Sequence, residues 1–588
     1  FWLKPFGSSL WLKPLSPSNQ ALSQAFPIPS APTPSTAPMA SSAPAAKSFA
    51  FIFPMASGHI NPSLPIAREL VELGHAVHFL CRGIMREAIE NTGATFHSDV
   101  EVMSELYEGR EADIFGAMAS LKKEFEIENE SFLTSLSKLS SVQLELMLPG
   151  VLRFLRETSA DACVFCPMMN IEAAMGAKVL GVPAVGLLTT AGPGSMTQSV
   201  AEFLAMENMQ PETLIEIERS FEPNAAALNR LNEAYGLGLE MGISWLRPLG
   251  YIKCFAMSAL TIVTTTEDLQ DPVSADLESK YREEQAAFAF VGPLLDKEGA
   301  VRASTHKMEK ASDGDEAKAA AKARHEQAAH DGASAGADLL AKVAAARAAG
   351  RRIVLASMGT VVTGDDDHLG WEGRLPGPDG QKRGLTGREL CRGAWAGAID
   401  AFGAAAEEEG PLLVLALGAQ PDPLGDLVAP PNAVCLPSVP QVDLLRAGVD
   451  VFLTHGGQNS FTESLAHGTP VVVCPGFGDQ MVNSRKAVTL GVGLKVDRPD
   501  PDAGAEAEAV ARFSADVSKA LLEVSAEPAY AAAAARCAEK IRHAGGVRRA
   551  VELVLSAAGV EAAPLAGPSK VAEAGMQASC LVKAAAGA

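Results

Sequence analysis

Residues 455–463 read His-Gly-Gly-Gln-Asn-Ser-Phe-Thr-Glu and stand between two apolar runs. This pattern predicts a strand, a tight polar loop and the start of a helix. Gly456 and Gly457 let the backbone approach a bulky anion, and the free N–H groups of a helix N-terminus favour a phosphate. Glu463 lies one helical turn further on, where a carboxylate accepts hydrogen bonds from sugar hydroxyls. The segment therefore indicates a site for a nucleotide sugar.

Short apolar runs alternate with helical patterns in two stretches of the chain, and each stretch predicts a parallel, doubly wound sheet. In the first stretch the predicted strands are 49–54, 76–80, 94–97, 161–165, 183–188, 262–265 and 288–291. In the second stretch they are 352–356, 412–417, 433–436, 449–453 and 470–474. We therefore expect an α/β protein.

A chain of 588 residues is too long for one core, and its composition divides it into segments. In order, we expect a disordered or leader-like extension (1–48), an N-terminal domain (49–295), a low-complexity linker (296–350), a C-terminal domain (351–558, with an inserted surface loop at 364–384) and a loose tail (559–588). Residues 1–38 leave organelle targeting, to a plastid for example, open beside a cytoplasmic location.

The net charge of −21 argues against a nucleic-acid or anionic-membrane partner. An uninterrupted apolar run of about 18 residues, as a transmembrane helix requires, is absent from the sequence. Most of the nine cysteines stand inside apolar runs, as reduced and buried thiols do in a cytoplasmic compartment. Cys163 and Cys166 form a C-x-x-C without a second pair, which favours strand packing over a zinc site.

Several motifs follow one another along the chain: Gly58-His59-Ile60-Asn61-Pro62, Phe290-Val291-Gly292-Pro293-Leu294, Ser357-Met358-Gly359-Thr360, Val439-Pro440-Gln441, the 455–463 segment, Gly478-Asp479-Gln480 and Asn483. Their order is typical of family 1 glycosyltransferases, the group that includes plant secondary-product and bacterial macrolide enzymes. The chain resembles this family over about residues 49–295 and 351–500. The resemblance implies two facing Rossmann-like domains, the GT-B fold, and inverting transfer from a UDP-sugar co-substrate without a cofactor or a metal.

The resemblance also implies a role for each matching residue of the C-terminal domain. The diphosphate is expected to contact His455, Gly457, Asn459, Ser460 and Thr360. Glu463 is expected to hold the ribose hydroxyls, while Val439 and Gln441 frame the base. Asp479 and Gln480 are expected to bind sugar hydroxyls, and such a pair is common among glucose users. Three Asp-x-Asp patterns are interpreted as solvated charge clusters rather than metal ligands: Asp313/Asp315, Asp365/Asp367 and Asp500/Asp502.

His59 is the candidate general base. It follows the first predicted strand and precedes a helix, at the carboxyl end of the sheet, where ligands of α/β proteins bind. An ordinary histidine pKa of ~6.5 suits removal of a proton from an acceptor hydroxyl.

The chain departs from the family pattern at Cys166, where members usually have the Asp that orients the base. A neutral thiol gives no comparable electrostatic support, and a thiolate would require a lowered pKa. Three possibilities stay open: Asp99 or Glu172 replaces that Asp, His59 works alone, or the chain is not an efficient O-glycosyltransferase.

The expected activity is transfer of a hexose, with glucose as the first choice, to a hydroxyl of a small lipophilic acceptor. Helical stretches rich in Met and Leu, at 103–158 and 195–250, are the expected acceptor region. One alternative, motivated by Cys166, is a non-catalytic or weakly active sugar-nucleotide or lipid binding protein. Another is a GT-B nucleotide-sugar epimerase, which should lack a large apolar acceptor region. A dehydrogenase is disfavoured because the first strand is not followed by Gly-x-Gly-x-x-Gly.

Overall fold

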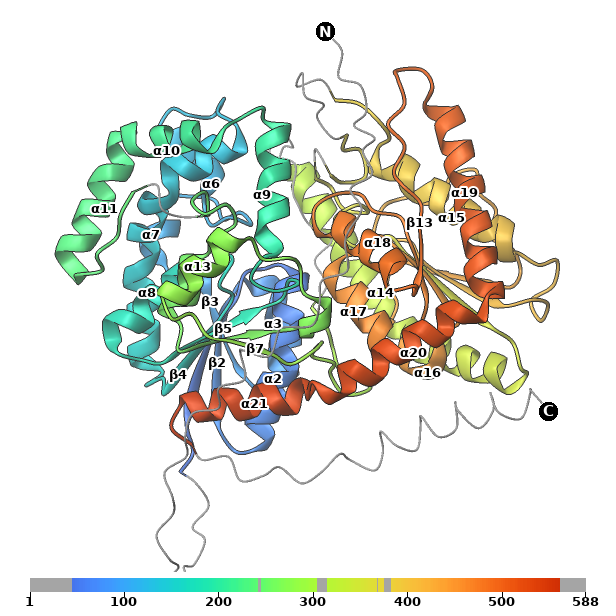
Figure 1. Ribbon diagram of the computed structural model, residues 1–588, viewed down its shortest axis with the longest axis horizontal. Coiled ribbons are helices and arrows are strands. Elements are labelled where there is room, and N and C mark those ends of the chain that lie inside the picture. The colour runs from blue at the N-terminus through green and yellow to red at the C-terminus, as the bar shows by residue number, and fades with distance from the viewer. Residues whose placement is uncertain (1–44, 242–244, 304–314, 367–368, 375–381, 561–588) are drawn as a thin grey trace, which may run out of the picture. The chain divides into compact units, whose positions relative to one another are not determined.

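Two parallel β-sheets, each flanked by helices, make up the computed structural model, which describes residues 45–241, 245–303, 315–366, 369–374 and 382–560 (Figure 1). Both sheets lie in one contact unit that begins at Ala46. The expected α/β class with two Rossmann-like domains is confirmed.

The first sheet has the order β3-β2-β1-β4-β5-β6-β7, with every neighbouring pair parallel. Its strands are β1 (Ser48–Ile52), β2 (Ala76–Cys81), β3 (Thr95–Ser98), β4 (Ala162–Phe165), β5 (Ala184–Leu188), β6 (Leu260–Val263) and β7 (Phe288–Phe290). Its helices are α1 (Ser57–Ile60), α2 (Leu64–Glu72), α3 (Arg86–Glu90), α4 (Asp99–Val102), α5 (Ser104–Tyr107), α6 (Met118–Glu124), α7 (Phe132–Glu157), α8 (Ile171–Leu180), α9 (Ser195–Met206), α10 (Pro211–Ser220), α11 (Glu222–Tyr235), α12 (Lys253–Met257) and α13 (Ala275–Glu283).

The second sheet has the order β10-β9-β8-β11-β12-β13 and is also parallel throughout. Its strands are β8 (Ile353–Ser357), β9 (Leu412–Ala416), β10 (Ala433–Leu436), β11 (Val451–Thr454), β12 (Val471–Val473) and β13 (Gly493–Lys495). The later helices are α14 (Asp315–Ala348), α15 (Gly387–Phe402), α16 (Gln441–Gly448), α17 (Gln458–Ala466), α18 (Asp479–Thr489), α19 (Glu506–Ala526), α20 (Pro528–His543) and α21 (Gly546–Ala557). All twelve predicted strands are present within two residues, and β13 is an addition.

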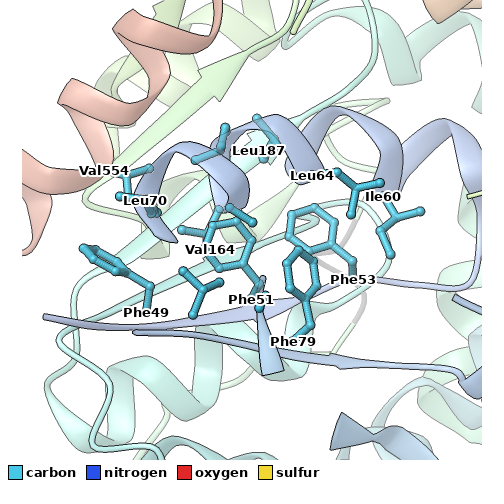
Figure 2. Packing of buried hydrophobic residues seen from close by; sticks show 14 of the residues in the cluster. Phe49, Phe51, Phe53, Ile60, Leu64, Leu70, Phe79, Val164, Leu187 and Val554 are labelled. Carbon is cyan, nitrogen blue, oxygen red and sulfur yellow. The ribbon is translucent and has the colours of Figure 1, made fainter. Parts of the chain in front are cut away.

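The core of the first sheet follows from the alternation of side chains along β1. Phe49 and Phe51 point to one face, where they pack with Leu64 of α2, while Ala50 and Ile52 join a separate cluster on the other face. Figure 2 shows the phenylalanines of β1 beneath α2. Burial on both faces explains why this strand reads as a continuous apolar run.

The last helix, α21, returns to the first sheet. Val551 and Val554 are fully buried in the cluster that contains Phe49, and α21 lies beside α2 (Figure 1). The final helix of the predicted C-terminal domain, 351–558, therefore packs on the N-terminal core, because the apolar residues of α21 are buried in the cluster that contains β1 and α2. At this crossing the N–H of Gly546 donates to the carbonyl of Val291 over 2.8 Å.

The predicted linker, 296–350, is only partly a linker. Residues 304–314 lie outside the described residues, but α14 continues to Ala348. Leu339 and Val343, one helical turn apart, are buried against Ile353 of β8. These few large apolar residues anchor the end of a helix whose composition is otherwise that of a spacer.

The predicted insertion, 364–384, is anchored rather than purely superficial. Trp371 is buried, with its ring centre 6.2 Å from that of Trp395 in α15. Residues 367–368 and 375–381 lie outside the described residues, as do 1–44 of the predicted extension and 561–588 of the predicted tail. None of the described helices is long and apolar enough to cross a membrane.

Candidate active site

Three loops of the first sheet meet around His59. They follow β1, β4 and β5, which are neighbours in the sheet, so that their carboxyl ends lie side by side. His59 stands on α1, after β1. Its Nδ1 is 3.3 Å from Sγ of Cys166, after β4, and 3.2 Å from Oγ1 of Thr189, after β5.

Burial decides whether the side chains of His59 and Cys166 are charged. It lowers the pKa of His59 to about 4, so the imidazole is neutral at pH 7. It raises the pKa of Cys166 to about 12, so the thiol keeps its proton. The shift at Cys166 is opposite to the one that a thiolate would require, and that alternative does not apply. Cys163 and Cys166 belong to separate core clusters and are both free thiols.

The two carboxylates considered as replacements for the usual Asp have other partners. Asp99 accepts from Nε of Arg82 at 3.0 Å. Glu172 is buried, accepts from Asn170 at 2.8 Å and has its pKa raised by burial to about 7. Among the described residues neither carboxylate forms a hydrogen bond or an ion pair with His59. The groups that replace the Asp at Nδ1 are a hydroxyl and a thiol.

In the second sheet, His455 follows β11 and its imidazole lies between two glycines. A Cβ added to Gly359 would stand 2.4 Å from Nε2 of His455, and one added to Gly457 would stand 2.5 Å away. Gly359 also has φ +77°, where side chains are strained. Burial lowers the pKa of His455 to about 4, so it too is neutral.

The first turn of α17 offers backbone donors. The N–H groups of Asn459 and Ser460 take no backbone acceptor in the described part of the chain, as expected at a helix N-terminus. The N–H of Gln458, in contrast, donates to Oδ2 of Asp479 over 2.8 Å. One carboxylate oxygen of Asp479 therefore caps α17, and the role of Asp479 toward sugar hydroxyls stays a prediction.

The side chain of Asn459 also has a role that the sequence did not indicate. Its Nδ2 donates to the carbonyl of Gly58, the residue before His59, over 2.9 Å. The loop after β11 is thereby joined to the loop that carries the candidate base.

Glu463 is buried in the middle of α17, with both carboxylate oxygens occupied. Oε1 accepts from Arg302 at 2.7 Å and Oε2 accepts from Nε2 of Gln441 at 2.7 Å. Burial alone would raise the pKa of Glu463, but the Arg302 guanidinium and these hydrogen bonds hold it below its usual value. Gln441 also donates to Oγ of Ser460, at 3.1 Å.

A cavity of about 130 Å³ lies beside these residues and is lined by Thr360, Val439 and Gln441, which the sequence assigned to the diphosphate and the base. Gln480 lies outside its lining. The side-chain oxygen of Gln480 accepts from the N–H of Gly476 at 2.8 Å, which leaves its Nε2 as the donor for a ligand.

The first domain contains a larger cavity of about 390 Å³. Its walls come mainly from the predicted acceptor stretches and include Met103, Met147, Met196, Phe132 and Phe203. Pro167 and Met168, which follow Cys166 directly, also line it, so the cavity reaches the loops around His59. It is large enough for a small lipophilic molecule.

Sequence reasoning missed two residues of this arrangement. Thr189 is, like His59, a polar residue that follows a buried strand, and it could have been found from that signal. Arg302 stands in a low-complexity segment and carries no such signal. In the described residues no three His, Cys, Asp or Glu side chains are grouped to hold a metal, and Asp313 and Asp367 lie outside those residues.

Residues 410–538 match the model of the family described as UDP-glucoronosyl and UDP-glucosyl transferase. The chain is 30% identical over 154 residues to the NDP-glycosyltransferase YjiC of Bacillus licheniformis, which is 25% of this chain and 35% of that protein. It is 42% identical over 91 residues to the anthocyanidin 3-O-glucosyltransferase of Hordeum vulgare, which is 15% of this chain and 20% of that protein. The match thus spans about a third or less of these relatives' own length.

The fold is shared over a much larger part of the chain. The structure of the glycotransferase of kitacinnamycin superposes with a TM-score of 0.53 at 21% identity, over 87% of this chain and 99% of that one. The two sheets therefore define a GT-B fold. The resemblance to family 1 glycosyltransferases is confirmed, and the match to the family model lies in the C-terminal domain.

Proposed function

We propose that the protein is an inverting UDP-glycosyltransferase that moves a hexose, with glucose as the expected sugar, to a hydroxyl of a small lipophilic acceptor without a metal. One observation carries this proposal: the hydrogen bond from Asn459 to the carbonyl of Gly58 joins the diphosphate loop to the base. A protein that only binds a sugar nucleotide has no need to couple these two loops.

The chemistry requires a single displacement at the anomeric carbon. Nε2 of His59 takes the proton from the acceptor hydroxyl, whose oxygen bonds to the anomeric carbon from the face opposite the diphosphate. The bond from that carbon to the diphosphate oxygen breaks, and its electron pair leaves with UDP. The backbone N–H groups of Asn459 and Ser460 and the α17 dipole stabilise the developing charge.

The cavity of about 390 Å³ supports an apolar acceptor. Its methionines give walls that adapt to different shapes, and Pro167 and Met168 in its lining directly follow Cys166, which contacts His59. The eight described cysteines are all free thiols, which supports a cytoplasmic location for the enzyme.

The test is a mass-spectrometric screen of UDP-sugars against phenolic, sterol and polyketide acceptors, combined with calorimetry of UDP binding. We expect a glycosylated product from the wild type. His59→Ala should lose transfer at least about a hundredfold but bind UDP normally, while His543→Ala, a change at an exposed helix end, should behave as wild type. If His59→Ala turns over as fast as the wild type, His59 is not the general base. UDP binding without any product would favour the binding-protein alternative.

A further inference from the structure

We infer that Thr189 is a positioning residue for His59: its hydroxyl accepts the Nδ1 hydrogen and thereby holds the ring in the tautomer that leaves Nε2 free to take a proton. The inference rests on the proposed function for its catalytic meaning. The contact on which it stands, 3.2 Å from Nδ1 to Oγ1, is a property of the fold itself.

The tautomer matters because a neutral imidazole has one nitrogen that carries hydrogen and one that accepts. With a pKa lowered to about 4, His59 is neutral at pH 7, and the hydrogen has to stay on Nδ1 if Nε2 is to act as the base. An isolated imidazole supplies no such control. The partner of Nδ1 therefore decides whether the base is competent.

Two groups are in contact with Nδ1, and they are unequal. Cys166 is a neutral thiol at 3.3 Å, and sulfur is a weak hydrogen-bond acceptor. Thr189 presents a hydroxyl oxygen with two lone pairs at 3.2 Å. The hydroxyl is the stronger acceptor, so it performs the orienting part of the task that an Asp performs in the usual family pattern.

The fold holds Thr189 rigidly. It follows β5 directly and is 4% exposed. Threonine is branched at Cβ, which restricts its side chain to few rotamers. Because β1, β4 and β5 are adjacent in the sheet, His59, Cys166 and Thr189 approach one another from three neighbouring loops.

The experiment compares wild type with Thr189→Val, which removes the hydroxyl at constant shape, and Thr189→Ser, which keeps it. We expect Thr189→Val to lower kcat by about five- to a hundredfold, with little change in KM for either substrate. Thr189→Ser should restore most of the loss. Cys166→Asp in the Thr189→Val background should also restore it, because a carboxylate then accepts the Nδ1 hydrogen.

A second readout needs no turnover. Nitrogen-15 spectra of histidine-labelled protein, with the His59 signal identified from His59→Ala, report which ring nitrogen carries the hydrogen. We expect Nδ1–H in the wild type and a shift toward Nε2–H in Thr189→Val. This result separates the two proposals, since the tautomer is measurable even if no transfer is found.

Three results would overturn the inference. The first is Nε2–H in the wild type, which would mean that Thr189 or Cys166 donates to Nδ1 and that Thr189 does not accept from it. The second is an unchanged kcat in Thr189→Val. The third is a loss that appears in KM alone, which would assign the hydroxyl to a substrate contact.

Discussion

Arg302 and Glu463, 161 residues apart in the chain, form an ion pair of 2.7 Å. Arg302 belongs to the segment that follows β7, while Glu463 is buried in α17. The same segment is held by Asn61, whose Nδ2 donates to the carbonyl of Ala303 at 2.9 Å. Arg302 therefore lies against the carboxylate that the family resemblance assigns to ribose hydroxyls.

Removal of Arg302 is expected to change donor affinity. If Glu463 serves the ribose, the guanidinium competes with it, and Arg302→Ala should tighten UDP binding about two- to fivefold. Titration calorimetry of UDP measures this directly, with Arg302→Lys as the control that keeps the charge. Weaker binding in Arg302→Ala would instead make Arg302 itself a ligand of the nucleotide.

The glycine at position 359 should tolerate no side chain. Gly359→Ala places a methyl group against the ring of His455, so UDP affinity should fall about tenfold or more. Gly491→Ala is the matched control, since Gly491 also has positive φ, +65°, but no atom within 4 Å of its added Cβ. If Gly359→Ala binds UDP as tightly as Gly491→Ala and the wild type do, the contact of Gly359 with His455 is unimportant for the nucleotide.

Glu172 should make stability depend on pH between about 4.5 and 7. Burial raises its pKa to about 7, so its contribution is fully present below the ordinary value near 4.5 and is lost as pH rises through about 7. Glu172→Gln keeps the oxygen that accepts from Asn170 and removes the charge. Its melting temperature relative to wild type should therefore be higher at pH 8 than at pH 5, and an equal difference at both values would contradict the shift.

His59 and His455 should make the protein less stable in mildly acidic solution. Both have pKa values lowered from 6.5 to about 4 by burial. Between these values the unfolded chain takes up protons that the folded protein does not, so the free energy of unfolding falls as pH decreases from about 6.5 to 4. Urea unfolding at pH 4.5, 5.5 and 7.5 should show a smaller dependence in His59→Gln and in His455→Gln. If the free energy of unfolding depends on pH in both variants as it does in the wild type, buried neutral histidines are not the cause.

Most of the fold could be predicted because buried parallel strands leave continuous apolar runs. β13 was missed because Gly493–Lys495 is too short for such a run and exists through its pairing with β12. The helical pattern of α21 was visible. Its packing partner was not, since the same apolar stripe would suit either sheet.

Some features of the candidate site could also be predicted from the sequence, and others could not. His59 and the 455–463 loop could be placed because the carboxyl ends of parallel strands collect ligands. The capping of α17 by Asp479 and the pairing of Arg302 with Glu463 depend on residues that are distant in the chain. Such contacts form only when the chain has packed, so the local sequence around each residue does not predict them.

The chain passes between the two sheets twice, after β7 and between α20 and α21, and the two passages touch where Gly546 donates to Val291. Because both connections meet at this hydrogen bond, the two sheets are tied to each other at one place by two separate stretches of the chain. Gly292 in one stretch and Gly545 and Gly546 in the other have positive φ, so these turns depend on residues without a side chain.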